Sequence, residues 1–540
     1  MDRIRSGALA ALCRGLVAAC TAAVTWTACA QTADAPLIEI RRFTVEGENP
    51  LSEQETQAIL APHLGRHTSL STIEAAAIAL ENVLRERGYS FHRVILPAQR
   101  PTEGEVKLQV LQFSLAEVAV TGNRHFSSDN ILRSLPGLES GKPPNLRELS
   151  RQLSLANEHP AKRMTVNIKE SQKPNHLDAE VRVTDVPSTQ TFLALTGGTR
   201  DVDNTINHNT GYTRLTLGHQ QSNLFDLDHA LTLTATTSPD HVSDVMQLGA
   251  FYWLPLYGYD TSLSAFWTRS DVDTGTVGVG GQSFTVSGRG EFWGLRATYA
   301  LPKFGRVSHH AALGFEDRFF KSEIGFQGAP ALNPNVGSRP LSLRYLARAE
   351  DIDWGIGGFL EYLVNLDGGR ANDDTSYNNA RAGARRGWDA WRYGIDANRA
   401  LGGGWNFVGR LRGQYTNDPL IPGEQFGLGG VSTVRGLRER ETSGDRGHAL
   451  NLEIHAPALE WGISPFVFYD AGERRHVTPI AGIPTSDSVA SAGVGARWSW
   501  ERQLEVSVTL ASVLNGVSLG TAPATDSGHT KLNFSLFYRF

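Results

Sequence analysis

The sequence predicts a mainly β membrane protein, a 16-stranded transmembrane antiparallel β-barrel preceded by two small α+β modules. Three observations carry this prediction. An export signal opens the chain, a β-α-α-β-β pattern then occurs twice, and short alternating segments fill the rest as far as Phe540. At 540 residues the chain is also too long for one compact domain.

Residues 1–30 have the pattern of a cleaved signal peptide. A basic head precedes an apolar, small-residue run that ends in Ala28-Cys29-Ala30, and these three regions in that order direct export. The segment Val17–Cys20 also resembles a lipoprotein signal. This alternative leaves only a very short apolar run between Arg14 and Cys20, whereas an export signal needs a longer one. All three cysteines lie in this segment, so we expect a mature chain without disulfides or thiolate metal sites.

Composition excludes several function classes. Removal of residues 1–30, which carry three arginines and one aspartate, takes the formal net charge from −5 to −7. This mild acidity argues against nucleic acid as a partner. Mean hydropathy is −0.26, and no later stretch supplies the ~18 apolar residues that a membrane helix needs. A search for long apolar stretches does not detect barrel strands, because their lipid-facing and lumen-facing residues alternate.

Two α+β modules are predicted over residues 37–113 and 114–187. The first has a strand at Ile38–Val45, helices beginning near Ser52 and Ser71, and strands at Phe91–Leu96 and Val106–Gln112. The second repeats the order with strand Leu115–Thr121, helices Ser127–Leu135 and Asn145–Ala156, and strands Thr165–Ile168 and Leu177–Val183. A three-stranded sheet with an open edge can accept an extended peptide as an added strand. Two α+β domains of unknown use remain the plainer alternative.

Residues 190–540 predict the barrel, because ten-residue alternating segments are separated by Gly, Asn, Asp and Pro clusters. The expected strands begin near residues 191, 212, 229, 244, 261, 290, 309, 340, 353, 388, 405, 449, 464, 489, 504 and 531. A soluble β-sandwich array is the alternative. Outer-membrane barrels often end in an outward-facing aromatic residue, which makes Phe540 the expected assembly signal. The interfacial aromatic girdles are expected to contain Trp253, Trp267, Trp293, Trp405 and Trp461.

A glycine-rich loop at residues 418–447 separates two of these strands and carries Val434, Arg435 and Gly436. Long ordered loops usually have a task. The candidate partner of Arg435 is Asp470, in the segment Phe468-Tyr469-Asp470-Ala471-Gly472. Strand alternation turns Asp470 into the lumen, and an arginine inside a partly desolvated lumen needs an anionic partner. The alternative for Arg435 is a solvated charge on an outer loop.

These motifs together resemble the TpsB transporters of two-partner secretion, the haemolysin secretion and activation family. The resemblance covers nearly all of the mature chain. Its motifs in the modules, in the barrel wall and in the loop are Gly88-Tyr89, Val94–Gln99, Gly104–Val106, Gly122-Asn123, Asn157–Pro160, Asn223–Phe225, Glu424–Gly430, Val434-Arg435-Gly436 and Phe468-x-Asp470-x-Gly472. The two modules are thereby identified as POTRA (polypeptide-transport-associated) domains.

The resemblance implies a protein translocator of the outer membrane with both POTRA domains in the periplasm. Such a protein binds an exported partner, an adhesin, haemolysin or toxin, and secretes it through the barrel pore. The resemblance further implies contact with outer-membrane lipid, insertion by the barrel-assembly machinery, a monomeric state, and no cofactor or catalytic step. In the family the loop arginine contacts the inner-wall aspartate, here Arg435 and Asp470.

Two departures from the family pattern stand out. Leu437 replaces the aromatic residue that usually follows Arg-Gly, so a stacking role at this position is not expected. The short segment between Gln31 and the first strand leaves no room for the plug helix that many members carry. We therefore expect the loop to be the main obstruction of the pore.

Alternative functions remain open. A barrel-assembly or translocation-assembly protein shares the architecture but usually carries more POTRA repeats, and a barrel enzyme or passive porin is the alternative of a different class. No catalytic residue and no metal site is predicted. Gly137–Pro143 is one residue short of a phosphate loop. His309-His310 is the nearest candidate pair of histidines. The aspartates of the predicted loops, Asp271, Asp273, Asp373 and Asp374, are interpreted as solvated charge rather than calcium ligands.

Overall fold

The computed structural model describes residues 38–67, 69–99, 104–198, 213–239, 242, 245–271, 275–279, 282–286, 289–321, 335–501, 503–518 and 524–540. The expected signal peptide, the segment that follows it as far as residue 37, and Asp273 lie outside these residues. The chain divides into two compact units. One contains most of the first α+β module, and the other contains the second module with the barrel.

The first module is built on a three-stranded sheet of order β2-β5-β4, in which β2 and β5 are parallel. Its elements are β1 (Ile38–Ile40), β2 (Arg42–Gly47), α1 (Glu53–Leu60), β3 (Gly65–His67), α2 (Ser71–Glu86), β4 (His92–Ile95) and β5 (Glu105–Gln112). Helix α1 begins with a capping box, because Ser52 and Glu55 satisfy each other's backbone N–H groups.

The single strand expected over Ile38–Val45 is wrong, because the structure has two. The N–H groups of Arg41 and Arg42 both donate to the carbonyl of Gly104, which turns the chain there. The residues before this turn pair with β3, and those after it pair with β5.

The second module repeats the arrangement within the other unit. It contains β6 (Ser114–Thr121), α3 (Ser128–Arg133), α4 (Leu146–Ala156), β7 (Lys162–Glu170) and β8 (His176–Asp185), with sheet order β6-β8-β7. Asn145 begins α4 by accepting the N–H groups of Arg147 and Glu148. Ile131, Leu149 and Val181 belong to the core between the helices and the sheet.

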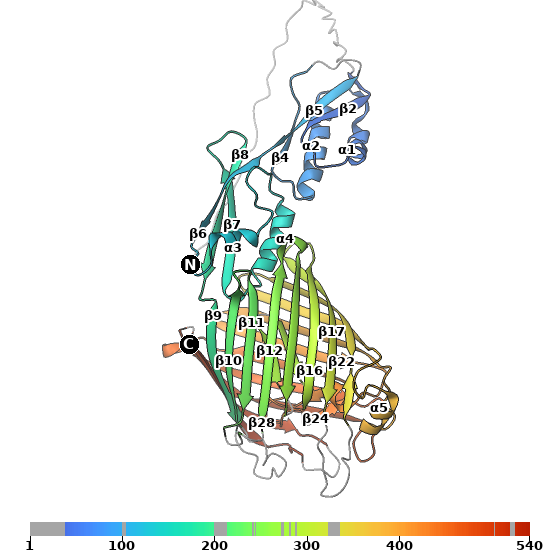
Figure 1. The fold of residues 1–540 in the computed structure, drawn as a ribbon, viewed down its shortest axis with the longest axis vertical. Helices are drawn as coiled ribbons and strands as arrows, with labels where there is room; N and C mark the ends of the chain where they lie inside the picture. Colours follow the sequence, from blue (N-terminus) through green and yellow to red (C-terminus); the bar gives the residue numbers. More distant parts are fainter. Residues whose placement is uncertain are drawn as a thin grey trace, which may run out of the picture. The chain divides into compact units, whose positions relative to one another are not determined.

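Sixteen long antiparallel strands form a closed barrel, as predicted (Figure 1). They are β9 (Thr189–Gly198), β10 (Thr213–Leu224), β11 (His229–Thr237), β12 (Met246–Leu256), β13 (Thr261–Ser270), β16 (Gly290–Ala300), β17 (Val307–Phe320), β19 (Pro340–Glu350), β20 (Trp354–Asn365), β21 (Asp389–Gly402), β22 (Trp405–Tyr415), β25 (Arg446–His455), β26 (Ile463–Arg475), β27 (Ser486–Trp500), β28 (Leu504–Asn515) and β29 (Thr530–Arg539). Pairing of β29 with β9 closes the barrel. A short β18 (Val336–Ser338) extends the pairing of β17.

Residues along each barrel strand alternate between the outer surface and the lumen. On β26, Val467 and Tyr469 are 52% and 42% exposed, whereas Phe468 and Asp470 between and beside them are 5% and 0% exposed. This alternation places charged side chains inside the barrel. No helix in the described part of the chain is long and apolar enough to cross a membrane.

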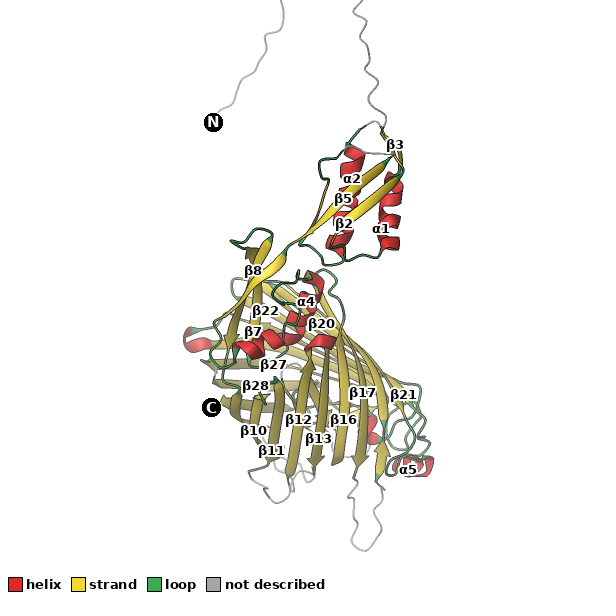
Figure 2. Cartoon of the chain, turned by 45° about the horizontal axis from the view of Figure 1, so that its top comes forward, coloured by secondary structure: helices red, strands yellow, loops and turns green. Residues whose placement is uncertain are grey.

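The prediction for Trp253 is wrong. Trp267, Trp293, Trp405 and Trp461 are all at least 37% exposed, but Trp253 is only 4% exposed. On β12, the two-residue period places Trp253 on the lumen side with the fully buried Phe251. Its ring lies 6.1 Å from that of His159 in the second module. Helix α4 lies at the same end of the barrel, where it contacts β16 (Figure 2).

Candidate functional site in the barrel lumen

The long loop between β22 and β25 has a defined stem and a defined tip. The stem is a short ribbon in which β23 (Phe426–Leu428) pairs with β24 (Thr442–Gly444). Gly429 and Gly430 turn the chain out of the ribbon with φ values of +118° and +87°, which favour glycine. The tip of the loop carries Arg435.

Arg435 is held by two carboxylates on the inner wall. Its Nε and Nη2 donate to the two oxygens of Asp470 at 2.7 Å each, and its Nη1 donates to Glu453 Oε1 at 2.8 Å. The backbone N–H of Arg435 also donates to Asp470 Oδ2, at 3.1 Å. Arg435 and Asp470 are 6% and 0% exposed. A bidentate guanidinium–carboxylate pair fixes direction as well as distance, so the tip has a defined seat in the lumen.

Phe468 completes the seat beneath the guanidinium. The Arg435 Cζ atom lies 3.6 Å from the centroid of the Phe468 ring, a cation–π contact. The ring lies across Gly493 on the neighbouring strand, where a Cβ would come within 2.6 Å of Phe468 Cζ. A side chain at position 493 would therefore displace the ring that supports Arg435.

Gly472 leaves room for the stem of the loop. A Cβ at this position would lie 2.6 Å from Leu428 Cδ2, closer than real contacts allow. Leu428 is fully buried in an apolar cluster with Val434 and Leu437. In Phe468-x-Asp470-x-Gly472, the three fixed positions thus supply a ring, a charge and a space.

The residues beside Arg435 fix the backbone of the tip. Gly436 has φ +96°, and a Cβ there would lie 2.9 Å from Val513 Cγ2, so both conformation and space require glycine. Val434 and Leu437 are 0% and 2% exposed and pack with Val489 and Val513 on the wall. Leu437 therefore fills an apolar pocket in the place of the aromatic residue.

Sequence reasoning missed the residues that support the pair. Asn451 lies opposite Asp470 in the β25–β26 register and donates to Asp470 Oδ1 at 2.8 Å. Glu453 also accepts from Arg497 at 2.9 Å. Alternation alone turns Asn451 and Glu453 into the lumen, but only the register of β25 on β26 places them beside the aspartate.

Phe540 lies at the free end of the last strand. Its N–H donates to the carbonyl of Thr191 on β9 at 2.9 Å, and its side chain is 68% exposed. The ring meets Tyr538 edge-on, with centroids 4.8 Å apart. Both aromatic rings thus belong to the outward-facing row of the strand.

A second buried ionic cluster joins the second module to the barrel mouth. Lys162 at the start of β7 donates to Asp228 Oδ2 at 2.5 Å and to Asn130 Oδ1 at 2.8 Å. Tyr257 donates to the same oxygen of Asp228 at 2.6 Å. Lys162 and Asp228 are each about 1% exposed. Burial beside this cluster lowers the pKa of His159 to about 4, so the imidazole is neutral.

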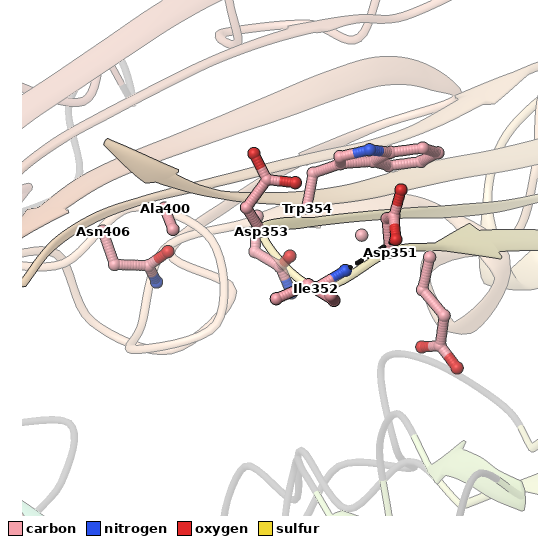
Figure 3. A pocket seen from close by; sticks show the side chains of 9 residues that line it. Asp351, Ile352, Asp353, Trp354, Ala400 and Asn406 are labelled. Carbon is pink, nitrogen blue, oxygen red and sulfur yellow. Dashed lines mark hydrogen bonds between the residues drawn. The ribbon is translucent and has the colours of Figure 1, made fainter. Parts of the chain in front are cut away.

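The remaining candidate features lie apart from the loop. A pocket at the turn between β19 and β20 is lined by Asp351, Asp353 and Trp354 (Figure 3), and Arg306 and Arg399 pair with its aspartates. Asp373 caps the short helix α5 (Asp374–Ala380). Among the described residues, no group of three or more His, Cys, Asp or Glu side chains is arranged to hold a metal ion.

Comparison with known proteins adds a family to this geometry. Residues 181–498 match the model of the haemolysin secretion/activation protein ShlB/FhaC/HecB, and residues 38–112 match the ShlB-type POTRA domain. The chain is 23% identical over 433 residues to the outer membrane transporter CdiB of Dickeya dadantii, covering 79% of this chain and 73% of the relative. It is 21% identical over 478 residues to the heme/hemopexin transporter protein HuxB of Haemophilus influenzae, covering 85% of this chain and 80% of the relative.

Solved structures give the same fold. CdiB from Escherichia coli superposes with a TM-score of 0.69 at 17% identity, covering 95% of this chain and 92% of that one. CdiB from Acinetobacter baumannii superposes with a TM-score of 0.67 at 16% identity, covering 94% and 90%. The fold thus occurs in proteins of low sequence identity to this chain.

Proposed function

The chain belongs to the haemolysin secretion/activation family ShlB/FhaC/HecB, and we propose that its lumen loop is the gate through which a secreted partner passes. Family members are TpsB transporters of two-partner secretion, with a barrel in the outer membrane and POTRA domains in the periplasm. The observation that carries the proposal is the buried bidentate pair of Arg435 and Asp470, which holds the loop in the lumen.

The pair suits a gate because it is specific without being permanent. A buried ion pair contributes little net stability, since desolvation offsets most of the Coulomb attraction, whereas loss of one partner leaves a costly unpaired charge. The seated position is therefore sharply defined, and a competing chain that offers its own polar contacts can displace it. We propose this role for Val434, Arg435 and Gly436 on the loop and for Phe468, Asp470 and Gly472 on the wall.

The partner enters from the periplasm in an unfolded state in this proposal. The POTRA domains over residues 37–113 and 114–187 bind it at their sheet edges, where β-strand addition supplies main-chain hydrogen bonds. An adhesin, a haemolysin or a toxin fits this route. Folding of the partner outside the cell supplies the driving force.

Two further roles belong to the same proposal. Family members are transporters, and we propose that this chain likewise has no catalytic step and uses no cofactor. Phe540, exposed beside the β29–β9 closure, is proposed as the signal that the barrel-assembly machinery recognises before the monomer is inserted into lipid.

Deletion of the loop tip tests the gate. Replacement of residues 429–441 by a short glycine linker should raise the conductance of the purified protein in a planar lipid bilayer and abolish secretion of the partner. A heat-modifiable band on semi-native electrophoresis controls for barrel folding. Conductance equal to that of the intact protein would remove the loop from the gate.

A further inference from the structure

Beyond the Arg435 seat, we infer that Glu424 is a second latch of the loop, which holds the entry of the stem to a different part of the wall, on β17, β18, β21 and β22. In this inference the pore opens only when both latches release. The inference rests on the proposed gating function of the loop. It adds a positioning residue that acts on the stem independently of the tip.

Glu424 lies in the segment that enters the stem and is completely buried. Its Oε2 accepts from Arg318 Nη1 at 2.6 Å and from Arg392 Nη2 at 3.0 Å. Its Oε1 accepts from Ser338 Oγ at 2.6 Å. The carboxylate therefore has charged or polar donors on both oxygens, and all three donors belong to the wall, on β17, β21 and β18.

The backbone beside Glu424 is fixed to the same region of the wall. Gln414 on β22 donates to the Glu424 carbonyl at 3.0 Å, and the same amide donates to the carbonyl of Asp445 at 3.1 Å. Gln414 thereby ties the two ends of the stem together. The ring of Phe320 covers Gly423 so closely that a Cβ there would overlap it.

The stem latch and the tip latch share no wall residue. Glu424, at the entry to the stem, is held by β17, β18, β21 and β22. Arg435 is held by β25 and β26, and its apolar neighbours pack on β27 and β28. The stem itself lies between them and contacts β26 through Leu428 and Gly472. The loop is therefore fixed at two separate places on the wall. Release of Arg435 frees the tip but leaves every contact of Glu424 in place.

The charge balance makes Glu424 a latch rather than ordinary packing. Among the described residues, Glu424 is the carboxylate paired with Arg392, whose Nε otherwise donates to the neutral Gln414 at 2.8 Å. Arg318 keeps a second carboxylate, Glu316, at 2.7 Å. Departure of Glu424 thus leaves Arg392 with no charged partner among these residues, so the stem resists release until water or a passing chain solvates that arginine.

The inference is tested by the frequency of channel openings of Glu424→Gln in a planar lipid bilayer. The amide is nearly isosteric but removes the charge that pairs with two arginines, so openings should become about tenfold more frequent or more. Glu316→Gln is the matched control, because it removes a carboxylate from Arg318 without touching the loop. Its opening frequency should stay within about twofold of the unmodified protein.

A double variant separates two independent latches from a single one. If the stem and the tip act independently, the fold-changes of Glu424→Gln and Asp470→Asn multiply in the double variant. In contrast, Glu424→Gln with Arg392→Gln should give less than the product of the two single effects, because both residues belong to one latch. A double variant of Glu424 and Asp470 that opens no more often than Asp470→Asn alone would overturn the inference.

Two outcomes locate the error if the test fails. Loop deletion without a change in conductance would refute the gate itself. An increase on loop deletion, with unchanged openings in Glu424→Gln, would leave the gate standing and overturn only the stem latch. If Glu424→Gln does not insert, Ser338→Ala removes one hydrogen bond from the carboxylate and should raise the opening frequency severalfold, whereas no change would again overturn the latch.

Discussion

Replacement of Asp470 by Asn should free the loop tip without unfolding the barrel. The carboxylate accepts four hydrogen bonds, two from the Arg435 guanidinium, one from the Arg435 backbone and one from Asn451. An amide of the same shape keeps one acceptor oxygen and turns a donor toward the guanidinium. The variant therefore loses the charge and at least one of the two strong contacts.

The free energy lost in Asp470→Asn depends on the contacts that Arg435 keeps. Removal of one partner of a buried ion pair costs about 3–5 kcal/mol when the other charge has no alternative. Arg435 keeps Glu453 at 2.8 Å, so we place the loss at about 2–3 kcal/mol. That loss corresponds to a shift of roughly 30- to 150-fold in the balance between seated and released tip.

Thiol labelling measures this balance directly. All three native cysteines lie within residues 1–30, so Val434→Cys introduces the single thiol of the remaining chain at a fully buried position. A membrane-impermeant maleimide should label it slowly when Asp470 is present and at least tenfold faster in Asp470→Asn. Asp396→Asn is the control, because Asp396 pairs with Arg412 at 2.7 Å on the lumen wall and, within the described part of the chain, has no hydrogen bond or ion pair with the loop tip. Equal labelling rates with and without Asp470 would refute the reasoning.

Three other outcomes are expected. Gly472→Ala should displace the stem at a cost of about 1–3 kcal/mol, because its Cβ would meet Leu428. The variant should therefore speed maleimide labelling at position 434, and adding Leu428→Ala should reverse this increase. A failure of that rescue would contradict the steric account. Lys162→Met should loosen the second module from the barrel mouth by about 3–5 kcal/mol, seen as faster hydrogen exchange of β7 amides, with partial recovery on adding Asp228→Asn. Acid should loosen the same contact between the second module and the barrel, because burial depresses the pKa of His159 from 6.5 to about 4. The contact is therefore fully stable above pH 6.5 and loses about 1 kcal/mol of stability at pH 5.5. His159→Gln should abolish this pH dependence of hydrogen exchange in β7.

The barrel was predictable from the sequence because its strands are locally determined. The two-residue alternation and the turn residues between segments locate all sixteen strand starts within three residues. Trp253 shows the limit of that reasoning. Aromatic residues are common at membrane interfaces, but the two-residue period of β12 places this one inside the barrel, against the second module.

The support of the loop could not be predicted because it depends on strand register and on contacts between distant segments. Arg435 and Asp470 stand out as a pair because each belongs to a short motif. Glu424 stands 106 positions from Arg318 in the chain, and nothing local marks their contact. Only closure of the barrel places β17, β21 and the loop stem together.

The use of charged residues to hold the loop has a physical reason. An apolar tip would be stable in the lumen but would expose its surface to water on release, which costs about 25 cal/mol for each Å². Arg435 and Glu424 lose their partners on release but regain hydration, so the released loop is soluble. The apolar contribution is confined to small groups beside the charges, such as Val434 and Leu437. Trimming this apolar set should therefore loosen the loop. Leu437→Ala shortens a side chain that is 2% exposed and packs in this cluster, so it should raise the labelling rate of a cysteine at position 434, and an unchanged rate would contradict the contribution assigned to the apolar groups.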